Sequence, residues 1–257
     1  CFGGSLGGVT PVTCIMGDGE LQEGQCYEAF QTIAHRALTS VLPIIDVNGI
    51  QSDSTTSDIK AIRSLRDVLE GFGLAVSEID GHSIPDIRTA VRERRAAQGA
   101  GVILARTRKG EGVSFMAADT CAGRGYEWHG GVPTPLQTAT ALDELAESLR
   151  PGPLRSRIKA YAAELRTSAT ARKPHAKSSV SAPLSTGQAL SAALCETAEA
   201  STEMVVLDAD LEKPCRLRPF ADRFPHRFFE MGIAEQDMVS TAGGLALAGR
   251  LPVVNTY

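Results

Sequence analysis

The chain has 257 residues, of which 43% are hydrophobic, and a formal net charge of −4. This length and composition allow a sizeable core in one large domain or two modest domains. The mild negative charge and the lack of long basic runs argue against nucleic-acid binding. No apolar stretch in the sequence approaches the roughly 20 residues that span a bilayer.

The six cysteines form neither a CxxC pair nor a spacing typical of a metal site. Cys14 and Cys26 fall in segments that we expect in the core. We therefore predict reduced thiols and a cytoplasmic protein. The first residue is Cys rather than Met, and we expect the natural protein to contain segments that this chain lacks.

Strand-like and helix-like patterns alternate in the first part of the chain, from residue 12 to residue 149. We predict buried strands at residues 12–16 and 41–47, further strands at 74–79 and 101–105, and helices at 23–38, 84–97 and 136–149. Such alternation is typical of a doubly wound parallel sheet with helices on both faces. An exposed helix at residues 150–166 is expected to follow.

A change of composition then predicts a linker. Residues 167–185 are rich in Thr, Ser, Ala, Lys and Pro. Beyond it we predict a helix at 186–200 with Thr186 as N-cap, strands at 204–207, 227–230 and from 252, and a helix at 234–248. We thus divide the chain into a first α/β domain (1–149), a helix and linker (150–183) and a second α/β domain (184–257). The second domain has about half the residues of a typical ~150-residue domain, so we expect it to be incomplete.

A polar motif follows each of the first two strands. Parallel strands bring Asp18, in GDGE, and Asn48, in NGI, to one carboxyl edge, where α/β proteins bind ligands. A hard divalent cation prefers carboxylate, amide and carbonyl oxygens, which Asp18, Asn48 and the carbonyl of Ile50 offer. Gly17 and Gly19 allow backbone N–H groups to approach an anion. The pattern predicts a site for magnesium, or calcium, and a diphosphate.

A GDG triplet alone is more often an ordinary turn, but its spacing favours the site. The 28 residues between Gly19 and Asn48 hold one predicted helix and one strand, which is a βαβ unit of ordinary size. GDG, a spacer of this length and then Asn resemble the cofactor motif of the transketolase family of thiamine diphosphate enzymes. The run GDGELQEGQCYEAF is especially similar to the transketolase branch.

Further blocks resemble the family in the same order along the chain. They lie at residues 48–53, 56–59, 80–82, 107–116, 128–130 and 232–236. A segment at residues 4–7 also resembles the family, although it normally lies a helix further upstream. The resemblance implies a diphosphate-binding domain at 1–149 and a partial pyrimidine-binding domain at 184–257.

The resemblance also implies the activity. Such an enzyme transfers a two-carbon ketol unit from a ketose, or its phosphate, to an aldose through an adduct with thiamine diphosphate. It would be a homodimer with its active site at the subunit interface, where Glu235 of one subunit serves the site of its partner. Neither a nucleic acid nor a membrane is expected as a partner.

Several residues take roles by resemblance. Glu235, in GIAEQ, matches the catalytic glutamate, whose carboxyl group stabilises the imino form of the cofactor pyrimidine; the alternative is a helix-terminal carboxylate stabilised by the dipole. His129 matches a histidine that donates to phosphate or moves protons at the substrate, although a loop histidine is more often simply solvated. The expected catalytic residues are Glu235 and His129, the cofactor-binding residues Gly17, Asp18, Gly19, Glu20, Asn48, Ile50, His129, Asp210, Leu211 and Glu235, and the metal ligands Asp18, Asn48 and Ile50.

Two alternatives stay open. One keeps the cofactor but changes the reaction, as in deoxyxylulose-phosphate synthases or 2-oxo acid dehydrogenase components; the runs GELQEG and KGEGVSFM favour transketolase. The other is a non-catalytic subunit of this fold that needs a partner chain. For Asp210 and Leu211 the alternative is simply a strand end and a core leucine.

Overall fold

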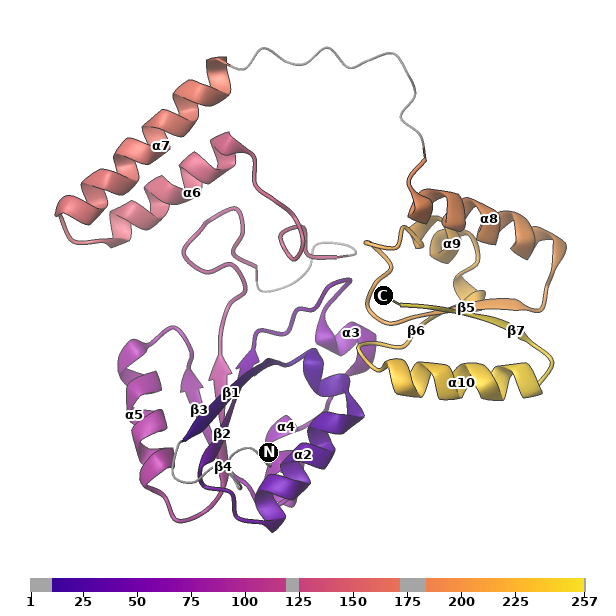
Figure 1. Cartoon of the computed structure of the whole chain (residues 1–257), viewed down its shortest axis with the longest axis horizontal. Helices are drawn as coiled ribbons and strands as arrows, with labels where there is room; N and C mark the ends of the chain where they lie inside the picture. Colours follow the sequence, from indigo (N-terminus) through magenta and orange to yellow (C-terminus); the bar gives the residue numbers. More distant parts are fainter. Residues whose placement is uncertain (1–10, 119–124, 172–183, 257) are drawn as a thin grey trace.

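The computed structural model describes residues 11–118, 125–171 and 184–256. The first part is built on a four-stranded parallel sheet in the order β1-β2-β4-β3 (Figure 1). Its strands are β1 (Val12–Gly17), β2 (Val41–Val47), β3 (Ala75–Asp80) and β4 (Gly101–Arg106). The predicted parallel sheet is confirmed, and all four carboxyl ends lie at one edge.

Helices cover both faces of this sheet, as predicted. The connecting elements are η1 (Glu20–Gln22), α2 (Gly24–His35), α3 (Thr56–Lys60), α4 (Leu65–Gly71) and α5 (Ile84–Ala96). Phe30 of α2 and Leu69 of α4 pack on Ile45, whereas Ala90 of α5 packs on Leu42 and Ile103 from the opposite face. Successive side chains of β2 thus point to opposite cores, which explains its unbroken apolar run.

The burial of the first strand was predicted wrongly. Val12 is 44% exposed and Ile15 is 73% exposed, because β1 is an edge strand that pairs only with β2 among the described residues. Cys14 is exposed too and Cys26 is half-buried, and neither forms a disulfide. An apolar run predicts a strand, but its place in the sheet decides its burial.

Two helices form a hairpin that stands away from the sheet (Figure 1). α6 (Pro135–Ser148) packs along α7 (Pro153–Ala171), with Ala139, Ala146 and Ala162 fully buried. Both arms are joined by ion pairs, Glu147 with Arg155 and Lys159, and Asp143 with Arg166. The sequence suggested that α6 belongs to the sheet layers and that the linker starts at residue 167. Both expectations were wrong, since α6 packs on α7 and α7 continues to Ala171.

The second unit is a smaller parallel sheet in the order β6-β5-β7. It comprises α8 (Thr186–Ala200), β5 (Met204–Asp208), α9 (Arg218–Arg223), η2 (Pro225–Arg227), β6 (Phe228–Glu230), α10 (Glu235–Leu247) and β7 (Leu251–Asn255). α8 and α9 cover one face and α10 covers the other, so the central strand β5 is buried throughout. The N-cap of α8 is Ser185 rather than the predicted Thr186, and it forms a capping box with Gln188.

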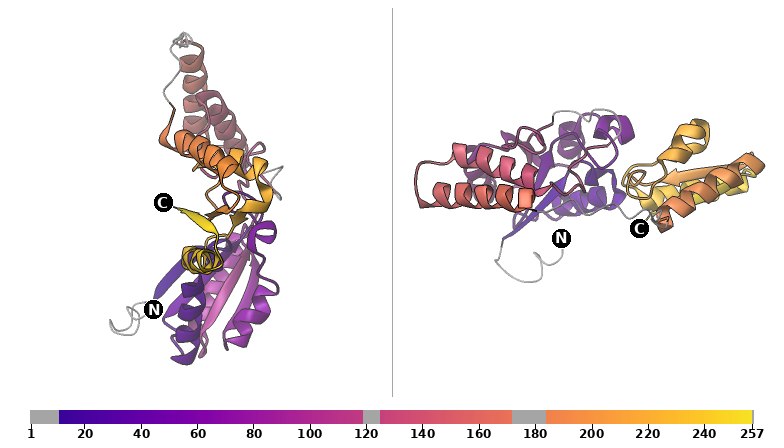
Figure 2. Two further views of the ribbon diagram at one scale, coloured as in Figure 1. Left: turned by 90° about the vertical axis from the view of Figure 1, so that its right-hand side faces the viewer. Right: turned by 90° about the horizontal axis from the view of Figure 1, so that it is seen from above.

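The α6–α7 hairpin and the second unit lie on opposite sides of the molecule, and the first sheet lies below them in the view of Figure 1 (Figures 1 and 2). The carboxyl edge of the first sheet faces the loops of the second unit. Within the described residues, none of the helices is both long and apolar enough to cross a membrane. The segment at residues 4–7 and most of the predicted linker lie outside the described residues.

Candidate functional site

The loops after β1 and β2 meet at the carboxyl edge of the first sheet, as predicted. One carboxylate oxygen of Asp18 accepts the N–H of Gly49 at 2.7 Å, and the other accepts the N–H of Gly19 at 3.0 Å. The side-chain oxygen of Asn48 accepts the N–H of Ile50 at 3.0 Å, which closes a tight turn. Gly49 has a φ of 74°, a left-handed conformation that favours glycine.

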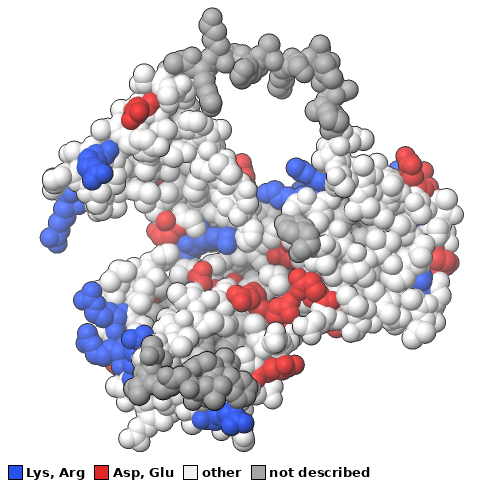
Figure 3. All heavy atoms as spheres, viewed as in Figure 1, with Lys and Arg blue, Asp and Glu red and all other residues white. Residues whose placement is uncertain are grey.

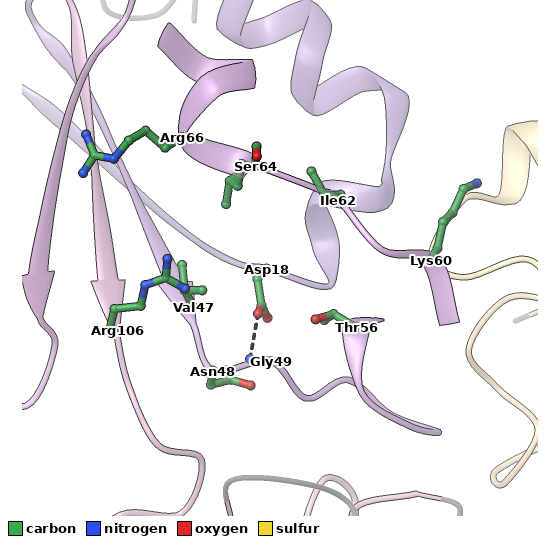
Figure 4. A pocket seen from close by; sticks show the side chains of 11 residues that line it. Asp18, Val47, Asn48, Gly49, Thr56, Lys60, Ile62, Ser64, Arg66 and Arg106 are labelled. Atoms are coloured by element: carbon green, nitrogen blue, oxygen red, sulfur yellow. Dashed lines mark hydrogen bonds between the residues drawn. The ribbon is translucent and has the colours of Figure 1, made fainter. Parts of the chain in front are cut away.

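A cavity of about 480 Å³ opens beside these loops (Figure 4). Asp18 and Asn48 line it together with three cationic side chains, Lys60, Arg66 and Arg106. Burial raises the pKa of Asp18, and the hydrogen bond from Gly49 opposes that shift. Each of these cations already pairs with a carboxylate, Lys60 with Asp237 and both arginines with Glu78. An anion bound next to a carboxylate-held cation would therefore share or exchange these partners.

The donor set fits magnesium. After its two hydrogen bonds the Asp18 carboxylate keeps unused lone pairs, and so does the Asn48 amide oxygen. Hard cations prefer such oxygen ligands. Ile50 is 3% exposed and lies in the same turn, so its carbonyl remains a predicted ligand.

The two flanking glycines have different surroundings. A Cβ at Gly17 would meet nothing within 4 Å, whereas one at Gly19 would lie 3.0 Å from the Cβ of Gln51 and 3.5 Å from Ile233. Close packing against Gln51 therefore gives a second reason for glycine at position 19, besides the predicted close approach of an anion. The N–H of Gly17 donates to the carboxylate of Glu20 at 3.3 Å.

A second cavity, of about 620 Å³, lies between the two units. Four of the predicted residues line it: His129, Asp210, Leu211 and Glu235. Lys213 and Arg216, which the sequence analysis had not singled out, also line it. Among the described residues the two cavities share no lining residue, so the predicted site residues fall into two neighbouring groups.

His129 is held at the second cavity by its own loop. Its backbone N–H donates to the carbonyl of Tyr126 at 3.2 Å, and the indole of Trp128 donates to the carbonyl of Phe115 at 3.1 Å. Partial desolvation lowers the pKa of His129, and the positive charges of Lys109 and Lys213 lower it further. The imidazole is therefore neutral at pH 7, where it can accept or donate a proton.

Glu235 is the first residue of α10, and its carboxyl group forms a hydrogen bond with that of Glu23, the N-cap residue of α2. This bond is the main reason that the pKa of Glu23 is raised to about 7, with desolvation next and Lys60 opposing it. Two carboxyl groups bond directly only when one is protonated. Glu23 is therefore partly protonated near neutral pH.

This pairing occurs within one chain. The resemblance implied that Glu235 serves the site of a partner subunit, whereas here it lies against Glu23 of its own chain. The homodimer stays a prediction. Asp237, one turn into α10, pairs with Lys60 of the first unit at 3.1 Å, which adds a second link between the same loops.

A reciprocal set of charged hydrogen bonds joins the two units, and we call it the aspartate clasp. Asp210 accepts the N–H groups of Ser52 and Asp53, both at 2.8 Å. In return Asp53 accepts the N–H groups of Glu212 and Lys213, at 2.5 and 3.1 Å. Asp53 and Asp210 are 4% and 3% exposed, so these are buried, charge-assisted bonds.

Further carboxylates gather beside the clasp. Oxygens of Asp53, Asp208 and Glu230 lie within 4.8 Å of one another, which is close enough for one cation. Burial raises the pKa of Asp208 to about 6 and that of Glu230 to about 8. Figure 3 shows acidic side chains concentrated where the two units meet. This group is distinct from the predicted metal ligands, and at neutral pH protons balance part of its charge.

Comparisons with known proteins bear on these two units. A family model described as the transketolase thiamine diphosphate binding domain matches residues 10–128, and one described as the transketolase pyrimidine binding domain matches residues 182–257. The chain belongs to the transketolase family. The predicted fold class, two parallel α/β units with a partial second domain, is thereby confirmed.

Individual transketolase relatives cover the chain to different extents. A transketolase from Pongo abelii is 30% identical over 96% of this chain, which spans 39% of that protein's length. A relative from Phocaeicola vulgatus, named as one of the subunits of an apulose-4-phosphate transketolase, is 35% identical over 52% of this chain and 46% of its own length. A solved transketolase from Campylobacter jejuni has 18% identity and a TM-score of 0.48, with 100% of this chain and 45% of that chain covered.

Several residues of the candidate site were missed by the sequence analysis. Glu23 and Gln22 lie in the quoted run GELQEG, and Asp53 and Gln51 lie in the quoted block 48–53. Their presence in matching blocks was the available signal. Gln22 and Asp53 have partners more than a hundred residues away in the sequence, and Gln51 pairs with Gln22, 29 residues away, so only the fold identifies their contacts.

Proposed function

We propose that this chain carries the diphosphate-binding and pyrimidine-binding parts of a thiamine diphosphate transketolase, which moves a two-carbon ketol unit from a ketose phosphate to an aldose. The observation that carries the proposal is the meeting of the Asp18–Asn48 loops with the loop of Glu235 at one junction. Family membership supports the cofactor, and the oxygen ligands and cationic side chains of the first cavity suit it.

Each group of residues has a distinct task in this proposal. Thiamine diphosphate, when bound, supplies the nucleophilic carbon that attacks the ketose carbonyl. Asp18, Asn48 and the Ile50 carbonyl would hold Mg²⁺ against the diphosphate. Glu235 would hold a proton at a nitrogen of the pyrimidine, and the neighbouring Glu23, whose pKa is raised to about 7, would hold its carboxyl group in place. His129, neutral at pH 7, would donate to or accept from substrate hydroxyls.

The first experiment tests the cofactor. Titrating the chain with thiamine diphosphate and MgCl₂ should raise its melting temperature, because a ligand that binds the native state stabilises it by about 2.7 kcal/mol at a hundred times Kd. Either compound alone should give a much smaller shift. No shift at millimolar concentrations of both would contradict the proposal.

The second experiment tests the reaction. With hydroxypyruvate or xylulose 5-phosphate as donor, Glu235→Gln should lower turnover by at least about 100-fold while leaving the melting shift with cofactor nearly intact. Glu196→Gln, at an exposed position on α8, is the matched control and should turn over normally. Pyruvate used in preference to these donors would favour the alternative in which the cofactor serves another reaction.

A second candidate function is supported by one comparison. The Phocaeicola vulgatus relative is named as one subunit of its transketolase, so this chain can instead be one of two chains that act together. Light scattering of the chain, alone and with cofactor, would test the predicted homodimer. Binding of cofactor without turnover by an assembled homodimer would favour the two-chain arrangement.

A further inference from the structure

Two buried glutamines bridge the loops at the junction. Gln22 and Gln51 are 7% and 3% exposed. The amide of Gln22 donates to the side-chain oxygen of Gln51 at 2.7 Å, and the amide of Gln51 donates back at 3.3 Å. Gln22 follows the GDG motif and Gln51 follows the Asn48 turn, so this amide pair joins the two loops that carry the predicted metal ligands.

The same pair also holds the loop that leads to Glu235. The side-chain oxygen of Gln22 accepts the N–H of Ile233 at 2.9 Å, and its amide donates to the carbonyl of Lys60 at 3.2 Å. A backbone N–H can only donate and a backbone carbonyl can only accept. These two contacts therefore determine the orientation of the Gln22 amide, and with it that of Gln51.

The backbone of the Glu235 loop is shaped around this contact. Gly232 has a φ of 72°, and a Cβ there would lie 2.3 Å from the side-chain oxygen of Gln22. Any other residue would both strain the left-handed backbone and displace Gln22. The glycine thus lets the loop approach the amide closely enough for the Ile233 hydrogen bond.

The contact sits next to the carboxyl pair described above. Gln22 precedes Glu23 in the chain, and Ile233 lies two residues before Glu235. A bond between Gln22 and Ile233 therefore brings the two carboxyl groups together from both sides. Besides Glu235, the groups that interact with Glu23 are Lys60 of α3 and Cys26 of α2. Lys60 also pairs with Asp237 of α10, and Cys26 also interacts with Glu20.

We propose that Gln22, supported by Gln51, is a positioning residue that docks the Glu235 loop on the metal-motif loop and sets the contact between the Glu23 and Glu235 carboxyl groups. The catalytic meaning of this contact rests on the proposed function, but the contact itself does not. Gln22 touches neither substrate nor cofactor in this scheme and acts only through the loop it holds.

The decisive variant is Gln22→Met, which keeps the side-chain length and removes the amide. Gln31→Met is the matched control, because Gln31 is exposed on α2 and makes none of these contacts. The readouts are carbon-13 NMR titration of glutamate side chains in the whole chain, and kcat, KM and the pH profile of ketol transfer in the holoenzyme.

In the parent and in Gln31→Met, Glu23 should titrate near pH 7, apart from Glu230, which should titrate near pH 8 in every variant. In Gln22→Met that titration should move down by roughly one to two pH units, because the paired carboxyl groups separate. Turnover should fall by about 10- to 100-fold with KM changed far less, as expected when a catalytic group is misplaced by an ångström or less. Gln22→Glu, which can still accept from Ile233, should recover part of the turnover.

Gly232→Ala provides a second route if Gln22→Met fails to fold. Here both amides remain but the loop is pushed off Gln22, so the same downward shift of the glutamate titration is expected. An unchanged titration near pH 7 in a folded Gln22→Met or Gly232→Ala variant overturns the positioning role. A parent chain that shows the titration shift but no ketol transfer overturns the proposed function instead.

Discussion

The two sheets present very different carboxyl edges to the junction between them. At the first edge Asp18 accepts two backbone N–H groups, and the cavity beside it is also lined by the cationic side chains Lys60, Arg66 and Arg106. At the second edge Asp208 and Glu230 are crowded against the clasp, and burial raises the pKa of both.

The difference teaches that similar strand–loop geometry can serve two purposes. The first edge combines the Asp18 carboxylate with backbone N–H groups and cationic side chains, which suits a cation with its anion. The second edge is rich in carboxylates, whose oxygens accept backbone N–H groups of both units, including those of Ser52 and Asp53 from the first. We therefore infer that the first edge binds a cation with its anion, and that the second edge holds the two units together.

The largest expected effect comes from removing the carboxylate of the first edge. Asp18→Asn should weaken binding of thiamine diphosphate with magnesium by at least about 100-fold, because the cation loses its charged ligand. At a concentration of a hundred times the parent Kd, stabilisation would fall from about 2.7 to about 0.4 kcal/mol. Calorimetric melting with and without cofactor measures this, and Asp67→Asn, exposed on α4, is the control. A full shift in Asp18→Asn would contradict the role of the first edge.

Breaking the clasp should instead affect stability without ligand. Asp210 has a φ of 58°, which asparagine tolerates, so Asp210→Asn replaces the charge without backbone strain. We expect a loss of roughly 1–3 kcal/mol in the free energy of unfolding, since buried N–H groups lose a charged acceptor. Urea unfolding, followed in each unit, measures this loss. The double mutant Asp210→Asn, Asp53→Asn should show a clear coupling energy between the two substitutions. Additive losses would mean that the two aspartates do not act as one clasp.

The second edge, together with Glu23 of the first unit, also predicts the pH dependence of stability. Glu23, Asp208 and Glu230 have raised pKa values in the folded chain, so the folded state binds more protons than the unfolded state between about pH 4.5 and 8. Their contribution is fully present at the acidic end and is lost as the pH rises. His129, whose pKa is lowered, works in the opposite direction below its ordinary pKa of 6.5.

The melting temperature should therefore be several degrees higher at pH 5.5 than at pH 8.5, at roughly 2–4 °C per kcal/mol for a chain of this size. Glu230→Gln keeps an acceptor for the N–H groups of Asp210 and Gly232 and should remove much of the slope. A melting temperature that rises steadily from pH 5.5 to 8.5 in low salt would show that the acidic edge is not protonated as described.

The smallest effect is expected at the exposed edge of the junction. Lys60 and Asp237 form an ion pair whose side chains are 40% and 58% exposed. Lys60→Met should change the free energy of unfolding by less than about 1 kcal/mol, because solvent screens such pairs. A loss as large as that of Asp210→Asn would show that the junction depends on this pair more than on the clasp.

Local patterns predicted much of the architecture. Apolar runs with β-branched residues located all seven strands of the described chain, and the 3.6-residue periodicity located the longer helices. Matching blocks identified Asp18, Asn48, His129 and Glu235 as candidates. These signals are local, because a strand, a turn or a capping residue depends mainly on its nearest neighbours in the sequence.

The failures share one physical cause. Val12 and Ile15 are as apolar as a buried strand, yet they are exposed because β1 lies at a sheet edge. α6 is amphipathic enough to cover a sheet, yet it packs on α7. Which surface a segment buries depends on partners that its own residues do not specify.

The sequence by itself determined the strand and helix types and the parallel connections, because each follows from short-range pattern, and matching blocks supplied the candidate site residues. Tertiary structure alone decided which of those residues meet. The Gln22–Ile233 bond, the Glu23–Glu235 pair and the aspartate clasp each join residues more than 150 positions apart. Burial of those polar groups obliges them to find partners, and only the folded chain supplies them.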